Sequence, residues 1–264
     1  MKKSIIIFRF HKEPFVCLNR LNLIKFYNPN IPIYGIYGGN NEDLPEHQKL
    51  LGNYFCNLYV VKNNSSEWKW KNFDLVLLDW YRDIGKQVDF NMAFTIEWDL
   101  LMFGSIKNIY AKIKNGEVGL TALIPLSEIE DDWFWTRTEP HKSEWNNLLN
   151  FVSETYQYSS KPLAALGPGV CFPKSFLGAY SELYLPELCH DEIRFPLVAQ
   201  LLGYPLFNTK FFKKWFNAEE YKYFNCDRQP IDSQIICNEL ASNGRKVFHP
   251  FFEIFDLSNI PKSK

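Results

Sequence analysis

Apolar residues along this chain alternate between short continuous runs and helix-spaced stripes. A run of β-branched and aromatic residues at 5–10 predicts a strand that is covered on both faces. Phe15, Leu18 and Leu21 follow at the spacing of one buried helical face, and Pro29 ends that predicted helix. Apolar runs at 31–37 and 58–61 predict two further strands, and a helix is expected at 74–84. This order of elements is typical of an α/β fold with a parallel sheet.

The second half of the chain continues the alternation. Apolar runs at 90–96, 119–125 and 163–172 predict strands, and residues 143–156 and 191–202 have the pattern of helices. A last apolar stretch at 246–255 predicts a strand that contains His249. The sequence has no internal repeat, low-complexity tract or obvious linker, so we expect one domain over residues 1–264.

Composition narrows the classes of protein. Hydrophobic residues make up 46% of the 264 residues, which excludes intrinsic disorder, and a formal charge of -1 argues against a nucleic-acid partner. The six cysteines form no C-x-x-C pair, so neither a zinc cluster nor a disulfide framework is expected, and we interpret the chain as cytoplasmic. No apolar run has the length of a transmembrane segment. The basic residues Lys262 and Lys264 leave a peripheral association with a membrane surface open.

The familiar phosphate-binding and hydrolase motifs are missing, which directs attention to carboxylates at strand ends. Neither G-x-x-x-x-G-K-[ST], G-x-G-x-x-G nor G-x-S-x-G occurs. Glu97 and Asp99 end a predicted buried strand and face the same side of an extended backbone, with Trp98 opposite. Two carboxylates at such a strand end suit Mg²⁺ or Mn²⁺ shared with the phosphate oxygens of a substrate. An ordinary solvated strand end has the same spacing.

Several segments, in order along the chain, resemble the GT-A nucleotide-sugar glycosyltransferases. Residues 96–99 resemble their D-x-D motif, with Glu97 in place of the first aspartate, and residues 247–250 resemble the late segment with a metal-binding histidine. The other matching segments are 5–10, 33–39, 77–82, 167–169 and 190–196. The resemblance implies a GT-A-like Rossmann-type nucleotide-diphospho-sugar transferase fold, with a central mostly parallel sheet flanked by helices. It also implies a nucleotide-sugar-binding half at 1–125 and an acceptor-binding half at 126–264.

The resemblance also implies roles for single residues. Asp99 and His249 would bind the Mn²⁺ or Mg²⁺ ion, and Glu97 would contact it through water or orient the ribose. A basic residue that helps to hold the diphosphate in some relatives is missing after His249, where Phe251 follows. The further nucleotide contacts are expected from Arg9, Gly38, Gly39, Asp79 and Trp98, and acceptor contacts from Gly167 and Gly169.

Asp191 and Glu192 are the candidates for the catalytic base. In an inverting transfer, one carboxylate takes the proton of the acceptor hydroxyl as this attacks the sugar. Both residues stand at the start of a predicted helix, where acidic residues are also favoured as N-caps and by the helix dipole. The sequence does not separate the two residues, and a retaining mechanism needs no such base.

Aromatic residues make up 17% of the chain, and those beside carboxylates are candidates for sugar stacking. Asp132, Trp133 and Trp135 lie in an acidic and aromatic segment. Tryptophan faces suit the C–H surfaces of sugars, and aspartate accepts hydrogen bonds from their hydroxyls. The competing interpretation is a loop whose aromatic rings fold back into the core.

These features together predict a metal-dependent glycosyltransferase. Its donor would be a nucleoside-diphosphate sugar, with UDP as the expected nucleotide, and its acceptor a hydroxyl of a glycan or glycolipid. One alternative is a sugar nucleotidyltransferase, although residues 10–14 lack the glycines of the N-terminal loop typical of that class. The other is a non-catalytic nucleotide- or carbohydrate-binding module, which Glu97 in the acidic motif favours.

Overall fold

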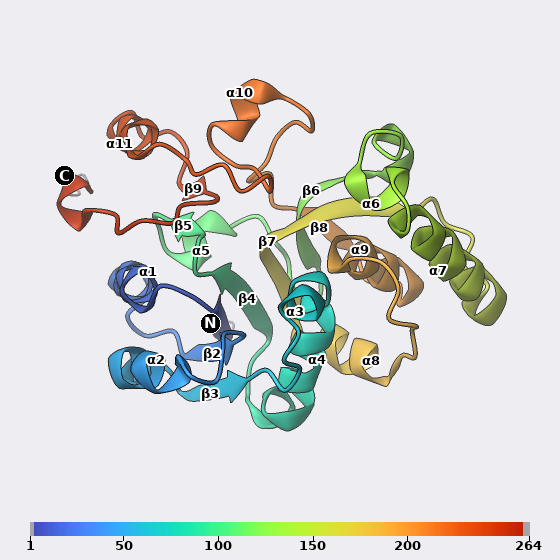
Figure 1. Cartoon of the computed structure of the whole chain (residues 1–264), viewed down its shortest axis with the longest axis horizontal. Helices are drawn as coiled ribbons and strands as arrows, with labels where there is room; N and C mark the ends of the chain where they lie inside the picture. The colour runs from blue at the N-terminus through green and yellow to red at the C-terminus, as the bar shows by residue number, and fades with distance from the viewer. Residues whose placement is uncertain (1–2, 261–264) are drawn as a thin grey trace.

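A seven-stranded sheet with helices on both faces forms the centre of the computed structural model, which describes residues 3–260 (Figure 1). The strands lie in the order β3-β2-β1-β4-β7-β6-β8. Strands β1 to β4 run parallel to their neighbours among themselves, and β8 is parallel to β6. Strand β7 is antiparallel to both β4 and β6. The expected α/β fold, a central mostly parallel sheet flanked by helices, is confirmed.

The strands of this sheet are β1 (Ser4–Phe10), β2 (Ile33–Tyr37), β3 (Asn57–Val60), β4 (Met92–Glu97), β6 (Val118–Pro125), β7 (Leu163–Pro173) and β8 (Leu206–Asn208). A separate antiparallel pair consists of β5 (Leu101–Met102) and β9 (Val247–Phe248). The helices of the first half are α1 (Pro14–Tyr27), α2 (Leu44–Leu51), α3 (Ser66–Lys71), α4 (Phe73–Asp83) and α5 (Ile106–Ile109). Those of the second half are α6 (Phe134–Arg137), α7 (His141–Tyr156), α8 (Lys174–Glu182), α9 (Asp191–Leu201), α10 (Ala218–Tyr221) and α11 (Ser233–Ala241). Short 3-10 turns are η1 (Gly52–Tyr54), η2 (Gly85–Gln87), η3 (Leu126–Glu128) and η4 (Leu257–Asn259).

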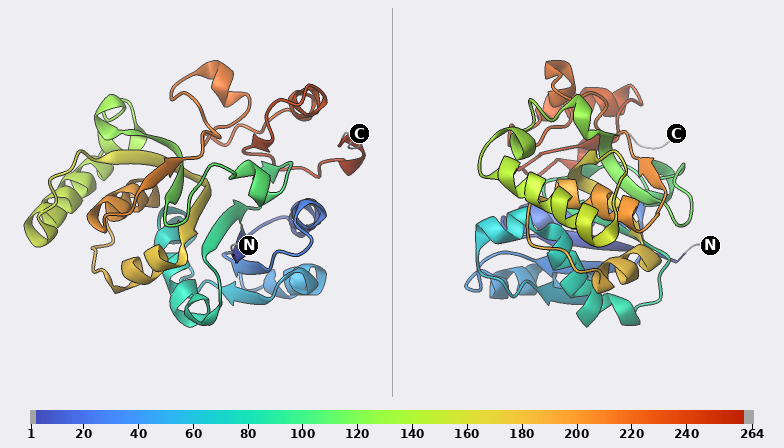
Figure 2. Two further views of the ribbon diagram at one scale, coloured as in Figure 1. Left: turned by 180° about the vertical axis from the view of Figure 1, so that it is seen from behind. Right: turned by 90° about the vertical axis from the view of Figure 1, so that its right-hand side faces the viewer.

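Strand β1 shows how the sheet is covered on both faces. Ile6, Phe8 and Phe10 point to one face and pack with residues of α1, α2 and α5. Ile5 and Ile7 point to the other face and pack with residues of α4, α8 and α9. Two layers of helices therefore enclose the sheet, as the views from behind and from the side also show (Figure 2).

The predicted late strand at 246–255 is wrong over most of its length. Regular pairing is limited to β9, and residues 249–256, which we call the strap, form no strand beyond an isolated bridge between His249 and Phe224. Pro250 has no N–H to donate to a ladder, and the carbonyls of Phe251 and Glu253 bind the side chain of Arg20 instead of a neighbouring strand.

A short acidic helix binds the segment that precedes β9. Glu220 in α10 accepts two hydrogen bonds from Arg245, at 2.5 and 2.8 Å, and a third from the backbone of Lys213 at 2.9 Å. Burial would raise the pKa of Glu220, but these partners lower it more, so that it lies below its ordinary value. The stability that this carboxylate contributes is therefore complete above the unfolded-state pKa and is lost as the pH falls through the folded-state pKa.

We expect Glu220→Gln to lower the free energy of unfolding by about 1.5–3 kcal/mol at pH 7, since it weakens bonds to a charged group. The difference from wild type should shrink as the pH falls from the ordinary glutamate pKa of about 4.3 through the lower folded-state pKa, since the wild-type carboxylate then becomes protonated. Urea unfolding at a series of pH values measures this. Glu219→Gln, at an exposed neighbour that pairs with Lys222, is the matched control and should change stability by less than about 1 kcal/mol. A pH-independent gap for Glu220→Gln would contradict the assignment.

Within residues 3–260, no helix combines the length and apolar character needed to cross a bilayer. Lys262 and Lys264 lie outside the described residues. All six cysteines are free, three of them buried, while Cys56 and Cys226 are exposed.

Candidate functional site

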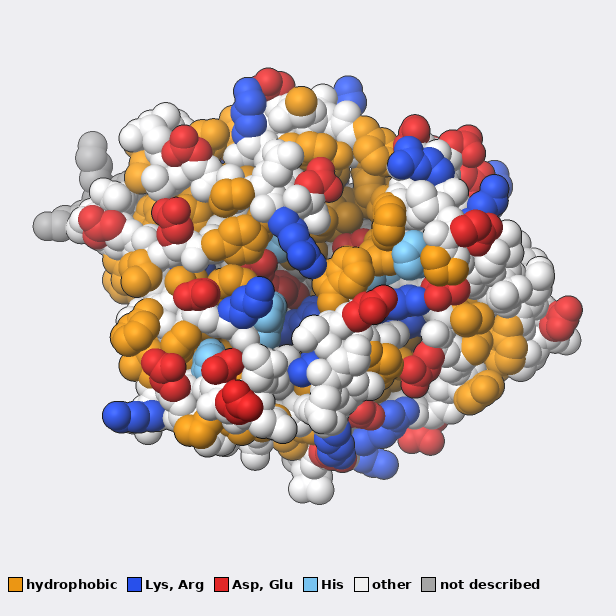
Figure 3. All heavy atoms as spheres, viewed as in Figure 1, with side chains coloured by type: hydrophobic (Ala, Val, Ile, Leu, Met, Phe, Trp, Pro, Cys, Tyr) orange, Lys and Arg blue, Asp and Glu red, His pale blue; other side chains and the backbone are white. Residues whose placement is uncertain are grey.

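The carboxyl ends of β1, β2 and β4 meet at one edge of the sheet and carry the candidate site. Arg9 and Glu97 are direct neighbours in the register of β1 and β4, so their side chains leave the sheet on the same face. Figure 3 shows a hollow near the middle of this view of the molecule, in which acidic and histidine side chains gather. The edge of the sheet thus places charges of both signs in one concave region.

Asp99 and His249 come together from distant parts of the chain. The Nε2 atom of His249 lies 3.7 Å from Oδ1 of Asp99, and Nδ1 of His249 lies 2.7 Å from the carbonyl of Asn225. Burial would raise the pKa of Asp99, but His249 lowers it more, and Asp99 in turn raises the pKa of His249 against the effect of burial. The two side chains therefore form an electrostatically coupled pair at the end of β4.

Glu97 faces the same region but is held by the backbone. Its Oε2 accepts a hydrogen bond of 3.2 Å from the N–H of Gly169 in β7. Burial raises the pKa of Glu97 to about 7, partly offset by the charges of Arg9 and His249. This carboxyl group exchanges a proton near neutral pH, whereas Asp99 stays ionised.

The part of the sheet edge beside β2 is built by two cations and a double-glycine turn. Lys69 of α3 donates to the carbonyls of Gly38 and Gly39, at 2.8 and 3.3 Å, and so fixes the turn after β2. Arg9 donates to the carbonyl of Lys69 at 3.0 Å, and its guanidinium lies 4.3 Å from the ring centroid of Phe73. Arg9 pairs directly with no carboxylate in the described part of the chain, so its charge remains available to an anion.

A cavity of about 380 Å³ adjoins this turn. Its lining includes Gly38, Gly39, His11 and His47. Burial lowers the pKa of His11 to about 4, with a further contribution from Arg9, so the imidazole is neutral at physiological pH. Trp98, which contacts His11 at a ring distance of 5.4 Å, is buried and stacks on Phe252 of the strap. Trp98 therefore packs between His11 and the strap.

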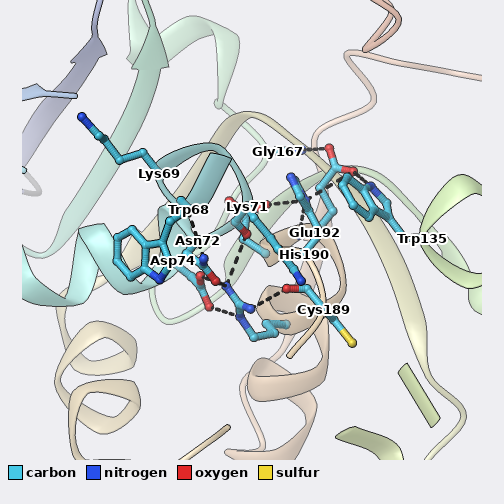
Figure 4. A network of polar contacts seen from close by, with 12 residues as sticks. Trp68, Lys69, Lys71, Asn72, Asp74, Trp135, Gly167, Cys189, His190 and Glu192 are labelled. Carbon is cyan, nitrogen blue, oxygen red and sulfur yellow. Dashed lines mark hydrogen bonds and ion pairs between the residues drawn. The ribbon is translucent and has the colours of Figure 1, made fainter. Parts of the chain in front are cut away.

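A second buried acidic cluster lies at the start of α9 (Figure 4). Glu192 accepts hydrogen bonds from the backbone of Gly167 at 2.9 Å and from the indole of Trp135 at 3.1 Å. Asp191 has His190 as its polar neighbour, with Oδ1 at 2.9 Å from Nδ1. Trp135 stacks on His190 with ring centroids 4.2 Å apart.

The environments of Asp191 and Glu192 differ in a way that the sequence does not reveal. Burial raises the pKa of Glu192, whose two oxygens are both occupied by donors. The pKa of Asp191 is lowered because His190 outweighs the effect of burial, and Arg9 lowers it further. His190 rather than Asp191 caps the helix. Of the two carboxylates, Asp191 is therefore the one whose pKa lies below its ordinary value, although it is as buried as Glu192.

The Gly167–Gly169 segment of β7 joins the two acidic clusters. The N–H of Gly167 binds Glu192, and the N–H of Gly169 binds Glu97. A Cβ atom at Gly169 would lie 2.9 Å from the ring of Phe211, and the residue has a φ of +75°, so both space and conformation require glycine there.

Other predicted site residues lie apart from this cleft. Asp79 is on α4, where it forms a pair with Arg82. Asp132 is exposed in a turn, and Trp133 is buried in a cluster with Trp215 and residues of α7 and α9. The competing interpretation for the aromatic segment, with rings folded into the core, thus describes Trp133, while Trp135 does contact Glu192.

Sequence reasoning missed His190, Lys69 and His11. A histidine directly before an acidic helix start is the signal that would have pointed to His190. Lys69 carried no signal, because its contact with the Gly38–Gly39 turn depends on how α3 folds back over β2.

The donors at the strand end fit a cation that is shared with a substrate. Asp99 offers carboxylate oxygens and His249 an imidazole nitrogen, a set that Mg²⁺ or Mn²⁺ completes with water and phosphate oxygens. Among residues 3–260, no group of three or more histidine, cysteine, aspartate or glutamate side chains is arranged to hold a metal by itself. A cage made only of protein ligands is therefore not what these residues provide.

Comparison with known proteins gives similarity of fold at low sequence identity. No family model and no curated protein matches the chain. One similar solved structure is entitled a 4-diphosphocytidyl-2C-methyl-D-erythritol synthase, with 11% identity, a TM-score of 0.48, and coverage of 89% of this chain and 97% of the other. Another is a cytidylyltransferase from Leptospira borgpetersenii serovar Hardjo-bovis, with 11% identity, a TM-score of 0.42, and coverage of 79% and 76%.

This finding corrects the expected glycosyltransferase function. Both titles carry cytidyl names, and neither describes a glycosyltransferase. The sequence signals for a glycosyltransferase were acidic strand ends and a late histidine, and these fit any enzyme that neutralises nucleotide phosphates at this edge of an α/β sheet.

Proposed function

We propose that this protein is a cation-dependent nucleotidyltransferase. It would transfer a nucleotidyl group from a nucleoside triphosphate to a phosphorylated sugar or polyol, which is the enzyme class of the sugar nucleotidyltransferase alternative. The names of the two similar structures suggest CTP as the first donor to test.

One observation carries the proposal: charges of both signs converge at the carboxyl ends of β1 and β4. Arg9 has no carboxylate partner among the described residues and lies beside Glu97 at the same sheet edge as the Asp99–His249 pair. The cavity beside Gly38 and Gly39 has room for a nucleoside at the end of β2. Triphosphate oxygens between these groups would meet a cation-binding carboxylate on one side and a guanidinium on the other.

In the proposed reaction, a phosphate oxygen of the acceptor forms a bond with the α-phosphorus of the nucleotide. The bond from that phosphorus to the oxygen that bridges to the β-phosphorus breaks, and pyrophosphate leaves. Arg9 would bind phosphate oxygens, and Lys69 would hold the turn that receives the nucleoside. A cation held by Asp99 and His249 would supply Lewis-acid neutralisation of the phosphates. A phosphate nucleophile needs no base, so Asp191 and His190 would bind acceptor hydroxyls.

Thermal stability with CTP, UTP, ATP and GTP, each with and without Mn²⁺, tests this function. Ligands that bind only the folded state raise its stability, and a concentration about one hundred times Kd should raise Tm by roughly 5 °C. We expect a Mn²⁺-dependent shift with at least one nucleotide, loss of that shift in Asp99→Ala, and its retention in Asp83→Ala, an exposed aspartate that pairs with Lys62. No shift with any nucleotide would overturn the proposal.

A non-catalytic nucleotide-binding module is the second candidate. It is favoured by the absence of glycine from residues 10–14 and by the lack of a protein-only metal cluster in the described residues. Pyrophosphate release with a mixture of sugar 1-phosphates separates the two. Release that requires Mn²⁺, nucleotide and acceptor supports the enzyme, whereas binding without release supports the module.

A further inference from the structure

Arg20 of α1 is a buried arginine without a carboxylate partner. Its side chain is 1% exposed, and its guanidinium contacts no acidic group within residues 3–260. Burial lowers the pKa of Arg20 to about 10, so it is charged at neutral pH. A buried charge is costly unless its hydrogen bonds are satisfied, so the fold must supply acceptors for this guanidinium.

Those partners are the strap, residues 249–256. Nη2 of Arg20 donates to the carbonyls of Phe251 and Glu253, each at 2.8 Å, and the guanidinium lies 5.2 Å from the ring centroid of Phe251. Nη1 donates to Oδ1 of Asn19 at 2.6 Å. Asn19 then completes a two-way contact with Phe255, donating to its carbonyl at 2.9 Å and accepting from its N–H at 3.0 Å.

The strap also holds the far side of the candidate cation site. It begins with His249, whose imidazole faces Asp99, and the N–H of Phe251 donates to the carbonyl of Asp99 at 2.8 Å. His249 and Pro250 also have backbone bonds to residues 223–231, including an isolated bridge between His249 and Phe224. From residue 251 to residue 255 the strap has no strand ladder, and side chains of α1 bind its carbonyls. Helix α1 and the strap are separated by more than two hundred residues in sequence but lie together in the fold, in agreement with Figures 1 and 2.

We propose that Asn19 and Arg20 are positioning residues that hold the strap and thereby place His249 opposite Asp99. The consequence for cation binding rests on the proposed function, but the structural part does not. A guanidinium suits this task because its planar fork reaches two carbonyls at once, which the single ammonium of lysine does not reproduce. Replacing the guanidinium should release the strap, while the sheet and the cavity beside Gly38 and Gly39 remain intact.

Hydrogen exchange of strap peptides is the first test, with Arg20→Lys, Arg20→Met and Asn19→Ala. The Phe251 and Phe255 amides are bonded in the wild type, and we expect their exchange to become about tenfold faster or more in each variant. Leu148→Ala, at a fully buried position of α7 away from the strap, controls for general destabilisation and should lower Tm without selective exchange of the strap. If Arg20→Met does not fold, the other two variants decide. Unchanged strap exchange in both would overturn the proposal.

Mn²⁺ affinity is the second test, read from the electron paramagnetic resonance signal of free Mn²⁺ in the presence of CTP. We expect Kd for Mn²⁺ to rise about tenfold in Arg20→Lys, while CTP binding in EDTA stays within about twofold of wild type. A released strap with unchanged Mn²⁺ affinity would overturn the positioning role.

Failure of the proposed function remains distinguishable from failure of this inference. If the wild type binds neither Mn²⁺ nor any nucleotide, the nucleotidyltransferase proposal falls. The inference is then judged by strap exchange and by the ¹⁵N spectrum of His249, which reports its contact with Asn225 without any ligand. Changes of both in Arg20→Lys support it, and a spectrum and exchange rate like those of the wild type refute it.

Discussion

Asp74→Asn is expected to lower the free energy of unfolding by about 3–5 kcal/mol, the range for breaking a buried ion pair by removal of one charge. Asp74 and Arg194 are fully buried, and the Nε atom of Arg194 lies 2.6 Å from Oδ2 of Asp74, with a second bond from Nη2 to the other oxygen. Asparagine keeps the shape but leaves the guanidinium without a compensating charge. Thermal or urea unfolding measures the loss, which corresponds to roughly 10 °C in Tm for a chain of this size.

The effect should extend to the site because Arg194 also organises the start of α9. It donates to the carbonyls of Leu188 and Cys189, at 2.9 and 2.6 Å, directly before His190 (Figure 4). Asp83→Asn is the matched control, since its pair with Lys62 is exposed and should contribute less than about 1 kcal/mol. The double variant Asp74→Leu with Arg194→Met should recover part of the stability lost in Asp74→Asn. Similar small losses for Asp74→Asn and Asp83→Asn would refute the assigned role.

The sheet was predictable because its strands have strong local patterns. Residues 5–10 are apolar on both faces, and the structure indeed covers both faces of β1 with helices. The prediction of a late strand was wrong because an apolar run alone does not distinguish a strand from an extended segment without strand pairing. The carbonyl partners of the strap come from Arg20, and a charged residue within a helix pattern is normally assigned to the solvated side.

The candidate site was predictable in part for the same reason. Glu97 and Asp99 stand at a strand end, and strand ends of an α/β sheet meet at one edge, so local pattern and general topology suffice to place them. Trp133 and Trp135 show the limit, because both rings are buried in one core cluster and only the indole of Trp135 also reaches Glu192, which the sequence does not reveal. Asp191 and Glu192 differ in the direction of their pKa shifts because different groups surround their carboxylate oxygens. Those surroundings are set by the packing of the whole fold and cannot be read from the sequence.

In the proposed nucleotidyl transfer, Arg9→Ala is expected to lower kcat/KM for the nucleotide by about 10²–10³-fold, the effect of removing one preorganised group that stabilises developing charge. Arg9 is suited to this role by its surroundings: its charge acts on Glu97, Asp191 and His11, yet it pairs directly with none of them. Its orientation is set by the carbonyl of Lys69 and the ring of Phe73. The charge is therefore positioned before any anion arrives.

Initial rates of pyrophosphate release, measured against nucleotide concentration, give the values for the wild type, Arg9→Ala and Arg9→Lys. Lysine retains the charge but not the fork, so Arg9→Lys should fall between the other two. Arg82→Ala, at an exposed arginine that pairs with Asp79, controls for loss of one positive charge and should stay within about twofold of wild type. If Arg9→Ala matched Arg82→Ala, the assigned role of Arg9 would be refuted, and the phosphates would have to be bound by another group, such as Lys12 of the cavity lining.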